Sequence, residues 1–304
     1  MENVDLETLE SERKVLIKKN RIRTLIGIGV FIPLTIIGIL IPEVLILFGV
    51  GIVVLVVMLV INAVNNGNLQ KKFKDIVVRS IIKEELGNDA IYEPDCGINY
   101  NELTSLKFAS YPDRYSLRDH IKSSYNGVEY EICDCHFEER RVTRDSKGNR
   151  QVHYVTYFKG RAIKIDFKRE LNINMKLVNE GPMGFSSEGL EKFETEVIDF
   201  NKKFKCYVDN SENGFYILTP LFIQKLLELE RMFRGGLVII FKHNNLYVLI
   251  NDSHDSLELS IKKPITGEQL DRIKGEVLLP ASIINELRMD DAKFNENFKH
   301  IMVF

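Results

Sequence analysis

The sequence predicts an α+β fold, in which an N-terminal transmembrane helical hairpin precedes a cytoplasmic domain with a largely antiparallel sheet and packed helices. The first observation is an apolar segment, residues 25–64, in a chain that is otherwise polar. The second is a set of strand pairs joined by short polar turns and mixed with helical patterns, without regular strand–helix–strand alternation. The chain has 304 residues, 45% of them hydrophobic, and is therefore long enough for one or two domains with real cores.

The apolar segment predicts two membrane crossings. It runs from Leu25 to Val64 and is interrupted by Pro42 and Glu43. A spanning helix needs about 20 apolar residues, and the halves 25–41 and 44–64 are each near that length. One helix over the whole segment would be about 60 Å long, twice the thickness of the hydrocarbon core. Proline disfavours helix in the residue before it, so we place the turn at Pro42 and Glu43. A buried helix pair of a soluble protein is the alternative, but such helices rarely run this far without a charged face.

The charges beside the two apolar helices predict their orientation. Basic residues flank both helices, whereas the connecting turn carries only Glu43. The flanking residues are Lys18, Lys19, Arg21 and Arg23 before the first helix and Lys71, Lys72, Lys74 and Arg79 after the second. The positive-inside rule then predicts a cell-membrane protein with both termini in the cytoplasm. A cleaved signal peptide fits poorly, because the N-terminal region holds five acidic residues. Neither helix carries an ionisable residue, which favours an anchor over a channel or pump.

Amphipathic helices are expected on both sides of the hairpin. Residues 1–24 form a cytoplasmic helix, either continuous with the first crossing or packed beside it, and residues 65–87 form a linking helix that stops at Gly87. One stripe of the first helix comprises Leu6, Leu9, Arg13, Leu16 and Ile17. The corresponding stripe of the second comprises Leu69, Phe73, Ile76, Val77 and Ile81.

Residues 88–304 are predicted to form the soluble α+β domain. The stretches VEYEICDCHFEERRV (128–142) and HYVTYFKGRAIKIDF (153–167) flank a polar turn and indicate a hairpin. A second hairpin, GGLVIIFKHNNLYVLI, turns between His243 and Asn245. Further strands are expected over 172–177 and 257–261. Helices are expected over 221–232, 268–277 and 282–287. The stripe predicted for helix 221–232 comprises Leu221, Lys225, Leu226 and Leu229.

Four residues resemble metal ligands: Cys133, Cys135, His136 and His153. On a strand the two cysteines share one face, and His136 points to the other. If the hairpin turns near residue 147, His153 pairs with about Arg141, which is about 20 Å from Cys135 along the strand. A four-ligand zinc site cannot close over that distance, so we predict no metal site. We interpret the cysteines as small buried apolar residues.

Catalytic and cofactor motifs are not found elsewhere in the sequence. Cys96 and Cys206 match no zinc, haem or redox spacing. The remaining histidines lie in no nucleophile context; they are His120, His243, His254 and His300. There is no glycine-rich phosphate loop and no nucleophile elbow, so we predict no cofactor and leave the catalytic residues unassigned. A net charge of −2 argues against nucleic acid as a partner.

Several stretches resemble the DUF3137 family of bacterial membrane proteins. They are LETLESERK, the two-helix hairpin, VTYFKGRAIKIDF, FNKKFKCYVDNSENGFYILTPLFIQKLLEL and IIFKHNNLYVLINDSHDSLELSI. The most specific part lies between Phe204 and Leu227, followed by the step from Phe158 to Gly160. The resemblance implies a cytoplasmic domain tethered by two helices and a LemA-type membrane protein as a partner, but no catalytic residues. The cysteines of EICDCHFEE depart from the family pattern, so no shared cysteine chemistry is implied.

Two functions of different class remain. The first is a membrane-anchored interaction or scaffold module that acts with another membrane protein, which the anchor and the lack of catalytic motifs favour. The second is a small-ligand sensor or enzyme with a pocket between the sheet and helix 221–232. A pocket with convergent buried ionisable groups would favour the second function. An exposed apolar patch would favour the first. We favour a non-enzymatic role and make no prediction of the oligomeric state.

Overall fold

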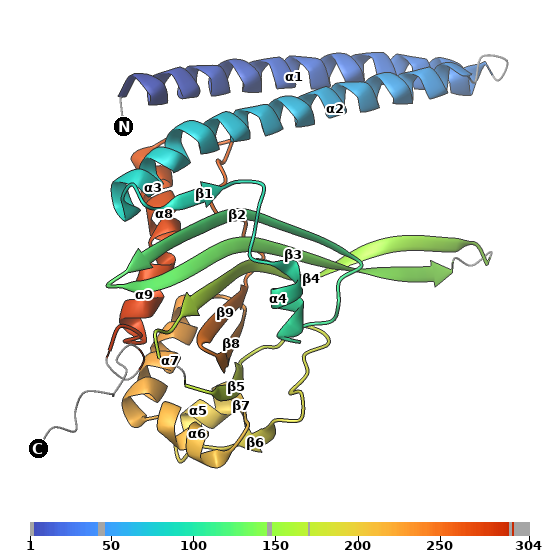
Figure 1. The fold of residues 1–304 in the computed structure, drawn as a ribbon. Coiled ribbons are helices and arrows are strands. Elements are labelled where there is room, and N and C mark those ends of the chain that lie inside the picture. Colours follow the sequence, from blue (N-terminus) through green and yellow to red (C-terminus); the bar gives the residue numbers. More distant parts are fainter. Residues whose placement is uncertain (1–2, 42–45, 145–147, 170, 292–293, 295–304) are drawn as a thin grey trace, which may run out of the picture. The chain divides into compact units, whose positions relative to one another are not determined.

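Two long helices begin the chain and carry the apolar segment. The computed structural model describes residues 3–41, 46–144, 148–169, 171–291 and 294 (Figure 1). Helix α1 spans Asn3–Leu40 and α2 spans Ile46–Phe73. Both are long and apolar enough to cross a membrane, by length and composition. The expected N-terminal helix is continuous with the first apolar half, which is one of the two predicted arrangements. The predicted turn at Pro42 and Glu43 lies outside the described residues.

Helices α1 and α2 contact each other through small and amide side chains. A Cβ atom added at Gly27 would lie 3.1 Å from the Leu55 side chain, so glycine permits the close approach of the two helices there. Nearer the N-terminus of α1, the Asn62 amide donates hydrogen bonds to Thr24 Oγ1 at 3.1 Å and to Asn20 O at 3.3 Å. These polar contacts set the register of the two helices.

The expected linking helix continues from α2 without a break. A π-helical turn, Lys74–Val78, joins α2 to α3, Arg79–Leu86, and the helix ends before Gly87, whose φ of 91° is the C-terminal geometry that glycine favours. The predicted stripe is wrong at Ile76, which is 37% exposed. A π turn inserts one residue into the helix and so rotates the stripe.

Residues 257–261 do not form the predicted strand. The Leu259 backbone is held instead by the Gln70 side chain, which accepts from its N–H at 2.9 Å and donates to its carbonyl at 2.6 Å. The next carbonyl along, that of Ile261, accepts from Arg13 at 2.9 Å. Helix side chains therefore satisfy the backbone groups that a neighbouring strand would otherwise satisfy. This segment belongs to the first of two compact units, which comprises Met1–Ile81 and Leu257–Lys274.

The second unit, Ile82–Ser256 and Gly275–Phe304, contains the sheet. Within the described residues nine strands pair in the order β1-β2-β3-β4-β9-β8-β5-β7-β6, all antiparallel, as predicted. Their bounds are Ile91–Glu93, Arg114–Tyr125, Val128–Arg144, Arg150–Asp166, Ile173–Val178, Glu191–Phe193, Lys205–Val208, Gly236–His243 and Asn245–Asn251 for β1 to β9. The two predicted hairpins are β3–β4 and β8–β9. At the second turn His243 adopts φ 55°.

Short helices accompany the sheet. They are α4 Tyr100–Ser105, α5 Ile198–Lys203, α6 Ser211–Ile217, α7 Pro220–Met232, α8 Gly267–Val277 and α9 Leu279–Glu286. The three predicted helices correspond to α7, α8 and α9. The predicted stripe of α7 is confirmed at Leu226 and Leu229, which are buried, and is wrong at Leu221, which is 47% exposed; Phe222 and Ile223 are buried instead. The Phe222 ring packs near Phe241 of β8, with ring centroids 6.2 Å apart, which explains the shift.

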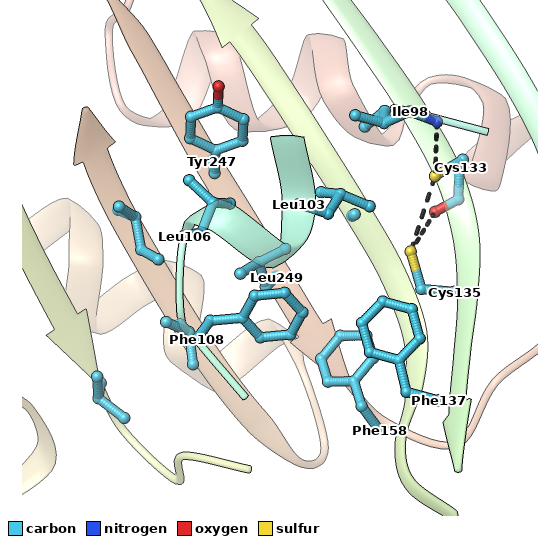
Figure 2. Packing of buried hydrophobic residues seen from close by; sticks show 14 residues of the cluster. Ile98, Leu103, Leu106, Phe108, Cys133, Cys135, Phe137, Phe158, Tyr247 and Leu249 are labelled. Carbon is cyan, nitrogen blue, oxygen red and sulfur yellow. Dashed lines mark hydrogen bonds between the residues drawn. The ribbon is translucent and has the colours of Figure 1, made fainter. Parts of the chain in front are cut away.

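A core cluster of aromatic and aliphatic residues lies against β3, β4, β8 and β9 (Figure 2). The Phe158 ring meets the Phe108 ring edge-on at 5.1 Å and lies 5.8 Å from the Phe137 ring. Gly160 is needed nearby, because a Cβ atom there would overlap the carbonyl of Ile250 on β9. Burial of each phenylalanine contributes about 2–3 kcal/mol to folding.

Candidate functional site

Cys133 and Cys135 are core residues of β3. Their sulfurs lie 3.7 Å apart on the same strand face, and the Ile98 N–H points at the Cys133 sulfur from 3.4 Å (Figure 2). Both side chains are buried, and burial raises the pKa of the Cys135 thiol well above its ordinary value. A shielded, protonated thiol is a poor nucleophile and a poor metal ligand. The environment supports the interpretation of both cysteines as small apolar residues.

His153 lies far from the cysteines along the hairpin. It pairs with Arg141 in the β3–β4 ladder, which confirms the predicted register. Arg141 is six residues from Cys135, or about 20 Å along a strand. His136 points away from the cysteine face, and its Nε2 lies 2.8 Å from the Thr156 hydroxyl. In the described part of the chain, no group of three or more His, Cys, Asp and Glu side chains is arranged to hold a metal ion.

The other cysteines and histidines, for which the sequence predicted no role, lie in separate environments where the structure describes them. Cys96 is exposed, whereas Cys206 is buried, which raises the pKa of its thiol to about 12. His254 lies 2.8 Å from the Glu276 carboxylate, and this hydrogen bond raises the pKa of the imidazole. His300 lies outside the described residues. These residues do not converge on one site.

A cluster of charged side chains that sequence reasoning missed surrounds Lys164 on β4. The Lys164 ammonium lies 3.0 Å from Glu102 of α4 and 3.8 Å from both Glu131 and Asp166. Glu131 also approaches His120, with Nε2 and Oε2 2.8 Å apart. The residues come from α4, β2, β3 and β4, so strand pairing brings the strand residues together and the packing of α4 adds Glu102.

The electrostatics of this cluster indicate a stable ion-pair network. The His120 hydrogen bond, together with nearby lysines, lowers the pKa of Glu131 to about 2, although burial opposes the shift. Burial, aided by the Glu102 carboxylate that accepts a hydrogen bond from Tyr247 at 2.7 Å, raises the pKa of the Tyr247 phenol. At neutral pH Glu131 is therefore ionised and Tyr247 protonated. Neither group is poised to exchange a proton near pH 7, as a general acid or base would be.

A cavity of about 500 Å³ borders the cluster. Its lining residues are Leu86, Asp89, Ile91, Lys122, Ser123, Ser124, Glu129, Tyr130, Glu131 and Asp166. The volume lies within the range of small-molecule sites, and the wall is mostly polar. None of the lining residues belongs to α7, where the sequence placed a ligand pocket.

A second cavity, of about 300 Å³, lies beside the buried Lys176 of β5. The Lys176 ammonium donates to the carbonyls of Leu106 and Ser186 at 2.8 and 2.9 Å and to the Glu188 carboxylate at 2.7 Å. These three bonds use all the donors of an ammonium group. Burial lowers the pKa of Lys176, but this bonding indicates a structural role rather than a reactive amine.

Asp134 of β3 is a partly buried acid whose pKa lies near neutrality. Burial raises the pKa of its carboxyl from 3.8 to about 7, and the neighbouring carboxylates of Asp119 and Asp255 act in the same direction. Its Oδ2 accepts a hydrogen bond from the Ser256 N–H at 2.7 Å, which opposes the shift. Ser256 is the last residue before the segment that belongs to the other unit. Asp134 therefore makes the stability of this region depend on pH.

The far ends of β3 and β4 form an arm, defined as residues 139–144 and 150–156. Pairing of β2 with β3 reaches Glu138, and pairing of β9 with β4 begins at Arg161. Beyond those points the described strands pair only with each other, and Figure 1 shows them extending past the rest of the sheet (light green). Val142 and Val152 oppose each other on the arm and are 41% and 46% exposed.

The arm is strongly basic. The residues of the arm hold four basic side chains, Arg140, Arg141, Arg144 and Arg150, and one acidic side chain, Glu139, although the whole chain has a net charge of −2. Alternation along the strands places Arg140, Arg144 and Arg150 on the same face as the two valines. These three guanidinium groups have no acidic partner among the described residues. At the base of this face, the Arg114 guanidinium stacks on the Tyr154 ring, 3.4 Å from its centroid.

Comparisons with known proteins add a family and a distant structural likeness. A family model described as "Protein of unknown function (DUF3137)" matches residues 156–289. No curated protein matches the chain. The crystal structure of the mycobacterial trehalose monomycolate transport factor A, TtfA, is 11% identical, with a TM-score of 0.35 over 69% of this chain and 94% of that one.

Proposed function

We propose that the chain, whose residues 156–289 belong to the DUF3137 family, is a membrane-anchored interaction module. Its arm binds an acidic surface on a partner protein at the cytoplasmic side of the membrane. The family description states no function, so the proposal rests on the geometry of the chain. The observation that carries it is the arm, which presents unpaired arginines and exposed valines on one face.

The composition of the arm face fits a protein-binding surface. Arginine is enriched at protein interfaces, because its planar guanidinium pairs with carboxylates and also packs on apolar groups. Val142 and Val152 supply apolar area at the centre of the face, and the arginines surround them. An acidic partner surface would be steered towards such a face and would neutralise its charge.

The two apolar helices would hold the module at the membrane. Neither contains an ionisable residue between Leu25 and Ile41 or between Val44 and Val64, as expected of an anchor rather than a transport path. Anchoring raises the local concentration of the module beside other membrane proteins, so a modest affinity of the arm suffices. A LemA-type membrane protein, which the family resemblance implies, is the first partner to test.

The arm is tested by photo-crosslinking in cells with the full chain. A photoreactive amino acid replaces Val152, and a matched probe replaces Ile198, which is 68% exposed on α5. We expect a crosslinked membrane protein from position 152 and none from position 198. The triple variant Arg140→Gln, Arg144→Gln, Arg150→Gln should abolish the crosslink.

The matched control changes three exposed lysines away from the arm to glutamine, namely Lys192, Lys202 and Lys205. This variant loses the same charge and should keep the crosslink. Equal crosslinking by the arm variant and the wild type would contradict the proposal, as would crosslinked partner peptides without acidic residues.

The membrane orientation has its own test. A phosphatase that is active only outside the cytoplasm should be inactive when fused after Phe304 and active when inserted between Pro42 and Glu43. The reverse pattern would place the arm outside the cytoplasm.

A small-ligand sensor is the second candidate, favoured by the polar cavity of about 500 Å³ beside Lys122 and Glu131. Native mass spectrometry of the full chain released from detergent should then show a small polar molecule bound. The variant Ser123→Leu, which adds a larger side chain to the cavity lining, should lose that molecule while the arm crosslink persists.

A further inference from the structure

A groove between α1 and α2 lies beside the apolar halves of these helices. It has a volume of about 350 Å³ and is lined only by residues of the two helices. The helices are held together at two levels along it, by the Asn20–Asn66 hydrogen bond at 2.8 Å and by the Glu12–Lys72 ion pair at 2.8 Å. These levels are eight residues apart on α1, or about 12 Å.

The end of the groove that holds Arg23 and Asn65 lies at the depth of the headgroup layer, if the apolar segment spans a bilayer. Arg23 and Lys19 precede the start of that segment, Leu25, by two and six residues, or about 3 and 9 Å along the helix. Asn65 directly follows its end at Val64. The headgroup layer extends about 5–8 Å beyond the hydrocarbon on each side, so Arg23 and Asn65 lie within it and the Lys19 side chain begins at its outer edge.

The lining combines cationic, polar and apolar side chains, and the Arg23 guanidinium also donates to Asn20 Oδ1 at 3.3 Å. Lys19 and Arg23 have no acidic partner among the residues that the structure describes, whereas Lys72 is paired with Glu12. Asn65 and Asn68 offer amide groups that can donate to phosphate oxygens or bind hydroxyls. The apolar part of the lining is formed by Val15, Leu16 and Leu69. Two unpaired cations beside hydrogen-bonding amides suit a phosphate ester that also carries hydroxyl groups.

We propose that this groove binds the headgroup of an anionic phospholipid, with Lys19 and Arg23 on the phosphate. The inference rests on the membrane anchoring proposed above. It goes beyond that anchoring, because a plain hydrophobic anchor would not discriminate between lipids of different headgroup.

The test uses the full chain in detergent and native mass spectrometry. Dioleoyl phosphatidylglycerol and dioleoyl phosphatidylcholine are titrated as probes, and we expect preferential retention of the anionic lipid. The double variant Lys19→Gln, Arg23→Gln should weaken phosphatidylglycerol binding about tenfold or more, because each cation near a headgroup contributes measurably. The control Lys18→Gln, Arg21→Gln removes the same charge from exposed positions outside the groove and should change binding less than about twofold.

Three results would overturn the inference. Equal losses in the two double variants would mean a diffuse surface attraction. Equal retention of both lipids would mean no headgroup site. Binding of glycerol 1-phosphate as tightly as the lipid would assign the groove to a soluble phosphate ester. Carbonate extraction of membranes distinguishes a failure of the headgroup site from a failure of the membrane anchor. A chain that resists extraction but shows no lipid preference keeps the anchor and loses only the headgroup site. A chain that is extracted refutes both the anchor and the headgroup site.

Discussion

Replacement of Asp134 by asparagine should make the second unit more stable at alkaline pH. The folded-state pKa of Asp134, about 7, lies above the ordinary value of 3.8, so the folded state keeps the proton longer than the unfolded state does. The stability that this difference contributes is fully present below about pH 4 and is lost as pH rises to about 7. Asparagine mimics the protonated acid, because its carbonyl oxygen can still accept from the Ser256 N–H.

The magnitude follows from the two pKa values. Between pH 5 and pH 8 the wild type should lose about 2–3 kcal/mol of unfolding free energy through this group, and the variant should lose none of it. His254 also has a raised pKa, so its stabilising contribution also falls as pH rises. The His254 contribution is present in both proteins, so it cancels when the unfolding free energy of the variant is compared with that of the wild type. We take a urea dependence of the unfolding free energy of about 2 kcal/mol per molar. The urea midpoint of the variant minus that of the wild type should then be about 1 M larger at pH 8 than at pH 5.

Tyrosine fluorescence of the full chain in detergent is the assay. All 11 tyrosines lie between residues 92 and 247 and the chain has no tryptophan, so the signal reports the second unit alone. The exposed Asp199→Asn variant is the control and should follow the wild type. A midpoint difference between wild type and Asp134→Asn that stays constant from pH 5 to pH 8 would refute the reasoning.

Three further changes have definite expected results. Gly160→Ala places a Cβ atom on the Ile250 carbonyl and should cost about 2–4 kcal/mol of unfolding free energy, measured by urea unfolding; wild-type stability would contradict the close approach. Lys176→Met leaves the Glu188 carboxylate and two carbonyls without their donor and should cost about 3 kcal/mol in the same assay, whereas an exposed lysine changed likewise should cost less than about 0.5 kcal/mol. Gln70→Leu removes both hydrogen bonds to the segment 257–261, so its backbone amides should exchange with solvent faster by mass spectrometry; unchanged exchange would mean that other contacts hold the segment.

Local patterns predicted most of the individual elements. The hydropathy of residues 25–64 indicated two long apolar helices, and polar turns located the β3–β4 and β8–β9 hairpins, including the pairing of His153 with Arg141. These features depend on residues close in sequence, where periodicity and turn chemistry act directly. The face of α7 was predicted correctly at Leu226 and Leu229 and missed at Leu221, because the i, i+3, i+4 spacing fits two neighbouring stripes and only the Phe241 ring selects between them.

The amino-acid sequence by itself determined the apolar hairpin, the strand and helix segments, and the burial of the cysteine pair, since each follows from composition or short periodicity. Only the tertiary structure decided which distant residues meet. Lys164 and Glu131 meet through the pairing of β3 with β4, and α4 brings Glu102 to them. The segment 257–261, with a strand-like pattern, stays irregular because Gln70 and Arg13 satisfy its backbone. The arm is exposed because β2 and β9 pair with β3 and β4 over only part of their length, and no local pattern records where a neighbouring strand stops.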